Sequence, residues 1–225
     1  MTDQQVKILV IGDSGVGKSS LVQYLKCLAL NKKFTTPSPT IGCNIEVLIH
    51  NNLPLELWDI SGSSAHPSYS QTRKVFYNNV NGLILVHDMN NVKSLNNLRS
   101  WLKEVRFNSS ATLTSVGTYD MEADERLLPS ILIGTKLDSI SEQKLATIQQ
   151  RIHRFAVDLR AEQLNLDVVS KEKTSIESQQ KFSNFFEAAV QHSKSTGHNL
   201  SNFSSFTKRE ETTRHRAKGV GIKID

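Results

Sequence analysis

The sequence predicts an α/β fold in which a mostly parallel six-stranded sheet carries helices on both faces. Short apolar runs alternate with amphipathic segments along the 225 residues, and strands separated by helices form parallel crossover units. Two of these runs, 82–87 and 130–134, are apolar nearly throughout, as expected for parallel strands buried on both faces. The composition agrees, because 38% hydrophobic and 22% charged residues are ordinary for a soluble globular chain.

The first half of the chain supplies three further strands and a helix. Residues 6–11 form a β-branched run that predicts a buried strand, and residues 19–25 open a helix with apolar side chains at helical spacing. Residues 44–49 and 55–58 flank a turn at 50–52, which predicts an antiparallel hairpin.

Later segments repeat the helical spacing. Apolar side chains recur three or four residues apart in 95–105, 145–159 and 182–190. Ser94 precedes the first of these segments, and we expect it to cap that helix. The strand-like residues 166–168 lie between the second and the third.

Two segments depart from this alternation. Residues 107–129 hold four acidic side chains and little apolar periodicity, which predicts a long acidic surface loop. Residues 194–225 are polar and carry seven Lys or Arg against three Asp or Glu, which is +4 of the formal net charge of +5. We therefore expect one domain at 1–193 followed by a basic, disordered tail at 194–225. The nearly neutral body argues against nucleic acid as a partner.

The most specific motif follows the first predicted strand. Residues 12–19 read Gly-Asp-Ser-Gly-Val-Gly-Lys-Ser, which fits the phosphate-loop pattern of glycine, four residues, glycine, lysine and serine. Such a turn at a helix N-terminus points backbone N–H groups at one spot and forms an anion site. Lys18 would add a charge for the β- and γ-phosphates, and the Ser19 hydroxyl would ligate Mg²⁺. The predicted phosphate contacts are Asp13, Ser14, Gly15, Val16, Gly17, Lys18, Ser19 and Ser20.

Two further segments resemble small GTPases of the Ras superfamily. Asp59-Ile60-Ser61-Gly62 matches the family's aspartate, two residues and glycine. The resemblance implies that Asp59 holds Mg²⁺ through water and that the Gly62 N–H contacts the γ-phosphate. Thr40, in Ser38-Pro39-Thr40-Ile41-Gly42, resembles the switch I threonine that ligates Mg²⁺ and senses the γ-phosphate.

A third segment, Thr135-Lys136-Leu137-Asp138, resembles the family's guanine motif. A carboxylate at position 138 would accept hydrogen bonds from the guanine N1–H and 2-amino groups, which adenine does not offer, and this favours GTP and GDP over ATP. The resemblance implies base contacts by Thr135, Lys136 and Asp138. It also implies the small G domain of a P-loop NTPase with GTP or GDP and Mg²⁺ as ligands, and it is strongest to the atypical subfamily called Rab-like protein 3.

Two departures concern the chemistry of the site. Hydrolytic family members follow the motif glycine with a glutamine that orients the attacking water. Here the residue is Ser63, whose side chain is too short to orient the water in the same way. The nearest glutamine is Gln71, eight residues further on. No catalytic residue is therefore assigned, and any GTP hydrolysis is expected to be slow. The fifth family motif has no clean match, and its best candidate is Ser170-Lys171.

Two further departures concern the base and the membrane. Phe34 lies six residues before Thr40, where it would either stack on the guanine or pack on the surface. The last cysteine is Cys43, so we expect no prenyl anchor. With two cysteines, no apolar run of ~20 residues and an N-terminus unlike a signal peptide, the chain is expected to be cytoplasmic. Membrane contact is expected to be peripheral at most.

Three functions are weighed. The first is a GTP/GDP switch that binds protein effectors or regulators in signalling or intracellular trafficking. The second is a guanine-nucleotide-stabilised scaffold that does not cycle, which Ser63 and the missing anchor favour, whereas the phosphate loop, Thr40 and Asp59 favour the switch. The third is an ATP-dependent small-molecule kinase, which Asp138 opposes. Neither the partner nor a homodimer can be derived from the sequence.

Overall fold

The computed structural model describes residues 5–63, 72–108, 128–169 and 175–196, and these residues contain one six-stranded sheet. The strands are β1 (Val6–Ile11), β2 (Cys43–His50), β3 (Leu53–Ile60), β4 (Gly82–Asp88), β5 (Ser130–Thr135) and β6 (Glu162–Asn165). Their order across the sheet is β2-β3-β1-β4-β5-β6, and β2 alone runs antiparallel to its neighbour. The predicted mostly parallel sheet is confirmed.

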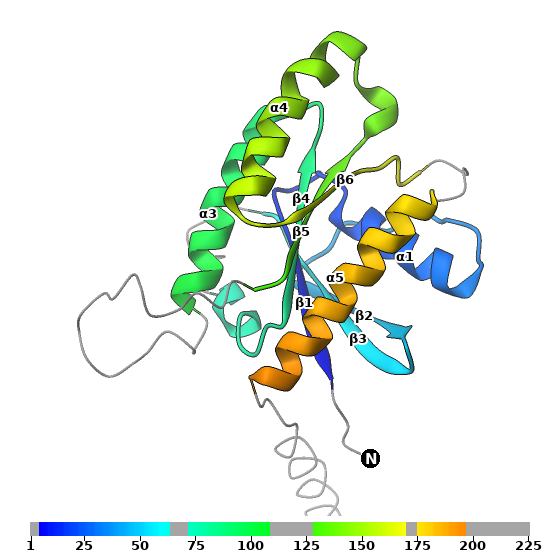
Figure 1. Ribbon diagram of the computed structural model, residues 1–225, viewed down its shortest axis with the longest axis vertical. Helices are drawn as coiled ribbons and strands as arrows, with labels where there is room; N and C mark the ends of the chain where they lie inside the picture. Colours follow the sequence, from blue (N-terminus) through cyan, green and yellow to red (C-terminus); the bar gives the residue numbers. More distant parts are fainter. Residues whose placement is uncertain (1–4, 64–71, 109–127, 170–174, 197–225) are drawn as a thin grey trace, which may run out of the picture.

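Helices cover both faces of the sheet. The helices are α1 (Lys18–Leu30), α3 (Val92–Asn108), α4 (Glu142–Asp158) and α5 (Ile176–Ser195), with short 3₁₀ turns η1 (Lys74–Phe76) and η3 (Leu137–Ser139). α1 and α5 lie on one face, and α3 and α4 on the other (Figure 1). Each face has its own apolar cluster, because successive strand side chains point to opposite faces. In β1, Ile8 and Val10 face α1 and α5, whereas Leu9 and Ile11 face α3 and α4.

The topology places the candidate site at one end of the sheet. β1, β3, β4 and β5 are parallel, so the loops that follow them leave the sheet at the same end. The helices after the neighbouring strands β1 and β4 lie on opposite faces, and their loops therefore diverge. In sheets of this kind, ligands bind in the crevice that such divergence opens.

The β2–β3 hairpin is tighter than predicted. Its strands pair from Cys43–Ile60 to His50–Leu53, so the turn consists of residues 51 and 52 alone. Both are asparagines with positive φ, +49° and +61°. Two-residue hairpin turns favour such residues, because a left-handed backbone matches the twist of the flanking strands.

The predicted cap of α3 was wrong. The helix begins at Val92, so Ser94 lies inside its first turn. Its hydroxyl donates to the Asn91 carbonyl oxygen (2.6 Å) and accepts from the Asp88 N–H (3.0 Å), which ties the helix to the end of β4. The Asn91 side chain accepts from the Lys93 N–H (3.1 Å), as a capping residue does.

The last strand also differs from the sequence expectation. The strand-like residues 166–168 follow β6 instead of forming it. The Leu166 N–H still donates to the Gly134 carbonyl oxygen (2.7 Å), but its own carbonyl oxygen accepts from Leu137, which follows β5. The chain therefore leaves the ladder at Leu166, although Leu166 and Val168 are buried.

The two predicted irregular segments are described only at their edges. Of the expected acidic loop at 107–129, residues 107 and 108 belong to α3 and residues 128 and 129 precede β5, while 109–127 lie outside the described residues. α5 continues through Ser195, and residues 197–225 of the expected tail are likewise outside them. None of the described helices is both long and apolar enough to cross a membrane.

Candidate nucleotide-binding site

The phosphate loop, residues 12–17, joins β1 to α1 and needs glycine at both ends. A Cβ on Gly12, which has φ +148°, would lie 2.1 Å from the carbonyl oxygen of Val86 in β4. Gly17 has φ +96° and precedes the first residue of α1, where no side chain caps the helix. Free N–H groups at the start of a helix bind anions. The loop therefore has the backbone geometry that a phosphate site requires.

The Lys18 side chain is folded back onto this loop. It is 6% exposed, and its Nζ donates to the carbonyl oxygens of Gly12 (2.9 Å) and Asp13 (2.8 Å). Burial lowers the pKa of Lys18 to about 8, against the charges of Asp59 and Asp13, which raise it. A phosphate group placed here would favour the protonated ammonium group. The other predicted phosphate contacts range from the exposed Ser14 and Gly15 to the half-buried Ser20 and the buried Val16.

Three side-chain oxygen atoms from separate segments meet at the start of α1. Ser19 Oγ lies 2.8 Å from Thr40 Oγ1 and donates to Asp59 Oδ2 (2.6 Å), and Thr40 Oγ1 lies 2.5 Å from the same Oδ2. Asp59 is fully buried, and within the described chain its Oδ1 has no hydrogen-bond partner. Hydroxyl and carboxylate oxygens are ligands that Mg²⁺ prefers. These residues therefore fit a Mg²⁺ ion, which would satisfy the buried carboxylate directly or through water.

The loop after β3 packs directly on the phosphate loop. A Cβ on Gly62 would lie 2.4 Å from both Asp13 C and Ser14 N, so only glycine fits there without displacing the phosphate-loop backbone. Ser63 follows with a half-buried side chain, and its carbonyl oxygen accepts from Arg73 Nη1 (2.7 Å). Gln71 lies outside the described residues.

The residues of the predicted guanine motif lie at the end of β5. The Thr135 hydroxyl is fully buried and donates to the Val16 carbonyl oxygen, which ties this strand to the phosphate loop. Lys136 has a left-handed backbone (φ +59°), and its Nζ pairs with Asp88 Oδ2 at 2.7 Å. Asp138 lies in η3 with an exposed carboxylate that accepts from Ser139 Oγ (2.9 Å). The motif thus has a buried anchor and an exposed carboxylate.

The remaining predicted base contacts are Phe34, Ser170 and Lys171. Phe34 is half-buried and packs against the apolar cluster on the α1 and α5 face. This contact agrees with the packing alternative for Phe34 and leaves guanine stacking a prediction. Ser170 and Lys171 lie outside the described residues.

Sequence reasoning missed the side chains that support the phosphate loop from α3. Asn97 Nδ2 donates to Asp13 Oδ2 (2.7 Å), and Trp101 Nε1 donates to Asp13 Oδ1 (3.0 Å). It also missed Asp88, the partner of Lys136. The polar side chains of 97 and 101, four residues apart on one face of a predicted helix, were the available signal. Their target lies more than 80 residues earlier, which spacing alone does not reveal.

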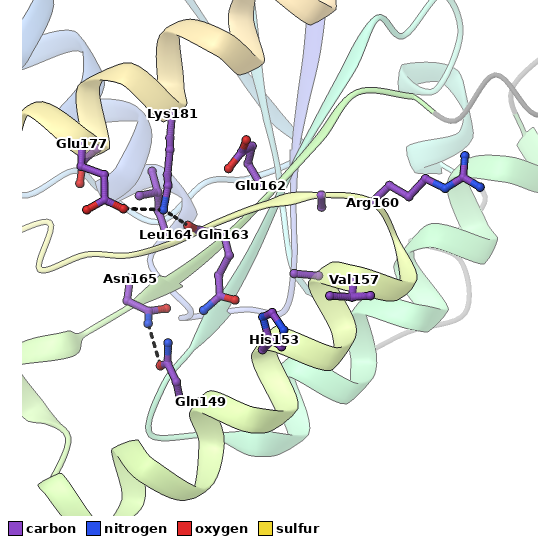
Figure 2. A pocket seen from close by; sticks show the side chains of 13 residues that line it. Gln149, His153, Val157, Arg160, Glu162, Gln163, Leu164, Asn165, Glu177 and Lys181 are labelled. Carbon is purple, nitrogen blue, oxygen red and sulfur yellow. Dashed lines mark hydrogen bonds and ion pairs between the residues drawn. The ribbon is translucent and has the colours of Figure 1, made fainter.

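A separate cavity of about 670 Å³ lies between α4, β6 and the start of α5. Figure 2 shows its polar lining, in which Lys181 pairs with Glu177 (2.8 Å) and donates to the Gln163 carbonyl oxygen (3.3 Å). Asn165 and Gln149 are hydrogen-bonded nearby (3.1 Å). None of the residues that line this cavity is a predicted nucleotide contact, so the candidate site rests on the loops after β1, β3 and β5 and on the segment between α1 and β2.

Comparison with known proteins identifies the family. The model of the Ras family matches residues 7–195. Rab-like protein 3 of Mus musculus is 42% identical over 205 residues, which are 83% of this chain and 85% of the relative. The Danio rerio protein of the same name is 41% identical over 203 residues, 83% and 86% of the two chains. Small GTPase-like protein LIP2 of Arabidopsis thaliana is 35% identical over 153 residues, 60% and 43% of the two chains. The expected likeness to Rab-like proteins is thus confirmed, and the chain belongs to the Ras family of small GTPases.

Proposed function

We propose that this chain is a GTP/GDP switch that binds its nucleotide with Mg²⁺. The observation that carries the proposal is the meeting of Ser19, Thr40 and Asp59 beside the phosphate loop. Thr40 belongs to the irregular segment between α1 and β2, so a ligand that engages Thr40 would also fix that segment. In nucleotide switches, contacts of the γ-phosphate and Mg²⁺ order such segments and are lost on hydrolysis.

Each part of the nucleotide has a candidate partner. Lys18 neutralises the β- and γ-phosphates, and the free N–H groups at the start of α1 surround them. Ser19, Thr40 and, through water, Asp59 would hold Mg²⁺, whose charge would offset that of the phosphates. Gly62 contacts the γ-phosphate through its N–H.

The base has its own partners in this proposal. Asp138 accepts from the guanine N1–H and 2-amino groups, and Thr135 and Lys136 support it. Phe34, Ser170 and Lys171 complete the proposed guanine contacts.

We also propose that GTP hydrolysis is slow. Ser63 stands where a water-orienting glutamine would be needed, and its backbone is tied to Arg73. The nucleotide state would therefore persist until a protein regulator intervenes. Single-turnover hydrolysis of labelled GTP, alone and with cell extract, tests this. Slow turnover that extract accelerates is expected, and GTP that stays intact under both conditions would contradict a cycling switch.

Protein partners are proposed to bind next to Thr40. Three side chains on one face of β2, Ile45, Val47 and Ile49, are 45%, 52% and 67% exposed. Alternate residues of a strand share a face, so they form an apolar row that continues from the Thr40 segment. A partner covering this row would sense the position of Thr40. We propose signalling or intracellular trafficking as the setting.

A cytoplasmic location with at most peripheral membrane contact completes the proposal. Electrostatic contact by the basic residues of 194–225 would weaken as salt rises, because charges more than ~8 Å apart are screened at physiological ionic strength. Flotation with acidic vesicles at increasing salt tests this, with a chain truncated after Ser195 as the comparison. Binding by the full chain that resists salt and requires detergent for release would contradict it.

A further inference from the structure

Helix α3 holds the phosphate loop from one side. Asn97, Trp101 and Glu104 are spaced at i, i+4 and i+7, so they lie on one face of the helix. Asn97 and Trp101 donate to the two carboxylate oxygens of Asp13, at 2.7 and 3.0 Å. Both oxygens of this phosphate-loop side chain are therefore fixed by α3.

One turn further along, the same face binds Arg73. Its Nε and Nη2 donate to the two carboxylate oxygens of Glu104, each at 3.0 Å, and its guanidinium carbon lies 4.6 Å from the centre of the Trp101 ring. The Tyr77 hydroxyl donates to Glu104 Oε1 (2.8 Å), and burial raises the pKa of Tyr77, so it keeps that proton. The Arg73 side chain is 8% exposed. A buried, bidentate and stacked arginine of this kind has a fixed orientation.

A third nitrogen of Arg73 reaches the loop after β3. Nη1 donates to the Ser63 carbonyl oxygen (2.7 Å), and the preceding Gly62 lies against the Asp13–Ser14 backbone. One face of α3 thus positions both the phosphate loop, through Asp13, and the Gly62–Ser63 backbone, through Arg73.

We propose that Arg73, held by Glu104 and Trp101, is a positioning residue that fixes the Gly62–Ser63 backbone at the γ-phosphate and so sets the preference for GTP over GDP. The inference rests on the proposed function, because that function assigns the γ-phosphate to the space between Lys18 and Gly62. Arg73 acts through the Ser63 backbone and does not touch the nucleotide. GDP lacks the γ-phosphate, so its binding does not depend on this backbone position.

The test compares the affinities of wild type and Arg73→Lys for GTPγS and GDP, both with Mg²⁺. Lysine keeps the charge but lacks the planar fork that joins Glu104 to Ser63. GTPγS affinity is expected to fall about three- to tenfold, while GDP affinity stays within about twofold. Arg99→Lys is the matched control, because Arg99, which lies on α3, likewise pairs with a carboxylate, Asp158 (3.1 Å), and covers an aromatic ring, that of Phe155 (5.0 Å). It should change neither affinity.

Tyr77→Phe provides a second, milder variant. It removes one hydrogen bond to Glu104 without opening a cavity, so a smaller shift in the same direction is expected. Melting temperatures show which variants fold. If Arg73→Lys does not fold, the affinities of Tyr77→Phe alone provide the test. An unchanged ratio of GTPγS affinity to GDP affinity overturns the inference. This includes the case in which both affinities fall by the same factor, because a general loss of packing would have that effect. If the wild-type protein binds neither nucleotide, the proposed function fails, and the inference fails with it.

Discussion

At the phosphate end of the candidate site the side chains already contact one another, whereas at the base end the central carboxylate faces solvent. Lys18 and Asp59 are buried, and hydrogen bonds join Asp59 to Ser19 and Thr40. Asp138, in contrast, is exposed in η3. The contrast indicates that the protein itself builds the phosphate end. Under the proposed function, selectivity at the base end would depend on a few exposed groups that act when guanine is present.

The largest expected effect follows from removing a phosphate-end contact. Lys18→Ala would delete the proposed charge-assisted contact to phosphate, and Ser19→Asn would replace the hydroxyl proposed as a metal ligand with a bulkier amide. Each should weaken guanine-nucleotide affinity by about 100-fold or more. Fluorescent-GDP titration measures this loss. Lys26→Ala is the control. Lys26 lies on the same helix, α1, and pairs with Glu46 of β2 at the surface, so this variant should bind the nucleotide normally. Stoichiometric GTP on both site variants would refute the phosphate-loop assignment.

A smaller loss of affinity, but a change of selectivity, is expected at the base end. Asp138→Asn would remove the proposed acceptor for N1–H and the 2-amino group of guanine and would place an amide donor opposite the 2-oxo group of xanthine. Guanine affinity should fall about tenfold or more, and the relative affinity for xanthine nucleotide should rise. Folding stability should hardly change, because Asp138 is exposed. Competition titrations with GDP and XDP provide the readout, with Asp158→Asn as the control. Equal selectivity in both proteins would place the base elsewhere.

The buried Lys18 also predicts a pH dependence of stability for the nucleotide-free protein. Its pKa is lowered from 10.5 to about 8, mainly by burial, so between these values the unfolded chain binds more protons than the folded one. The free energy of unfolding should therefore rise as pH increases from about 8 to 10.5. Lys7, with a pKa also lowered to about 8, acts in the same window.

Urea unfolding across that window isolates the share of Lys18. Lys18→Met should reduce the rise in the free energy of unfolding by about 1–2 kcal/mol, and Lys7→Met should remove a separate part of that rise. Identical pH profiles for wild type and Lys18→Met would show that the buried ammonium group carries no such penalty.

The smallest expected effect concerns hydrolysis. Ser63→Gln restores the side chain that orients water in hydrolytic relatives, and intrinsic GTP turnover should rise a few-fold. The gain is limited because the backbone of position 63 stays tied to Arg73. Single-turnover kinetics with Ser63→Asn as a shorter amide control measures it. A wild-type rate that already equals that of a glutamine-bearing relative would remove the reason for the substitution.

Sequence patterns predicted the central strands β1, β4 and β5 better than the edges of the fold. β1, β4 and β5 are buried on both faces, so they appear as continuous apolar runs, and the loop after β1 has a motif with a fixed backbone geometry. β6 was missed because Glu162–Asn165 is an edge strand with one buried apolar side chain, Leu164. The cap of α3 was misassigned because serine also bonds to carbonyl groups inside a first turn, as Ser94 does.

The supporting contacts of the site were beyond local patterns. Asp13 and its partners Asn97 and Trp101 are joined only by the fold, as are Ser63 and Arg73 through the packing of α3. Spacing within a helix shows which side chains share a face but not which distant loop that face meets. Motifs therefore indicated the groups proposed to touch the nucleotide, and the structure was needed to identify the residues that hold them.

The affinity of nucleotide-depleted protein for GDP and ATP, with and without Mg²⁺, tests the central claim most directly. If Ser19, Thr40 and Asp59 form a metal-assisted phosphate site joined to a guanine site at Asp138, GDP should bind at least about 100-fold more tightly than ATP. Chelation of Mg²⁺ with EDTA should weaken GDP binding. Equal affinity for ATP and GDP, or a GDP affinity that does not change when EDTA is added, would contradict the account.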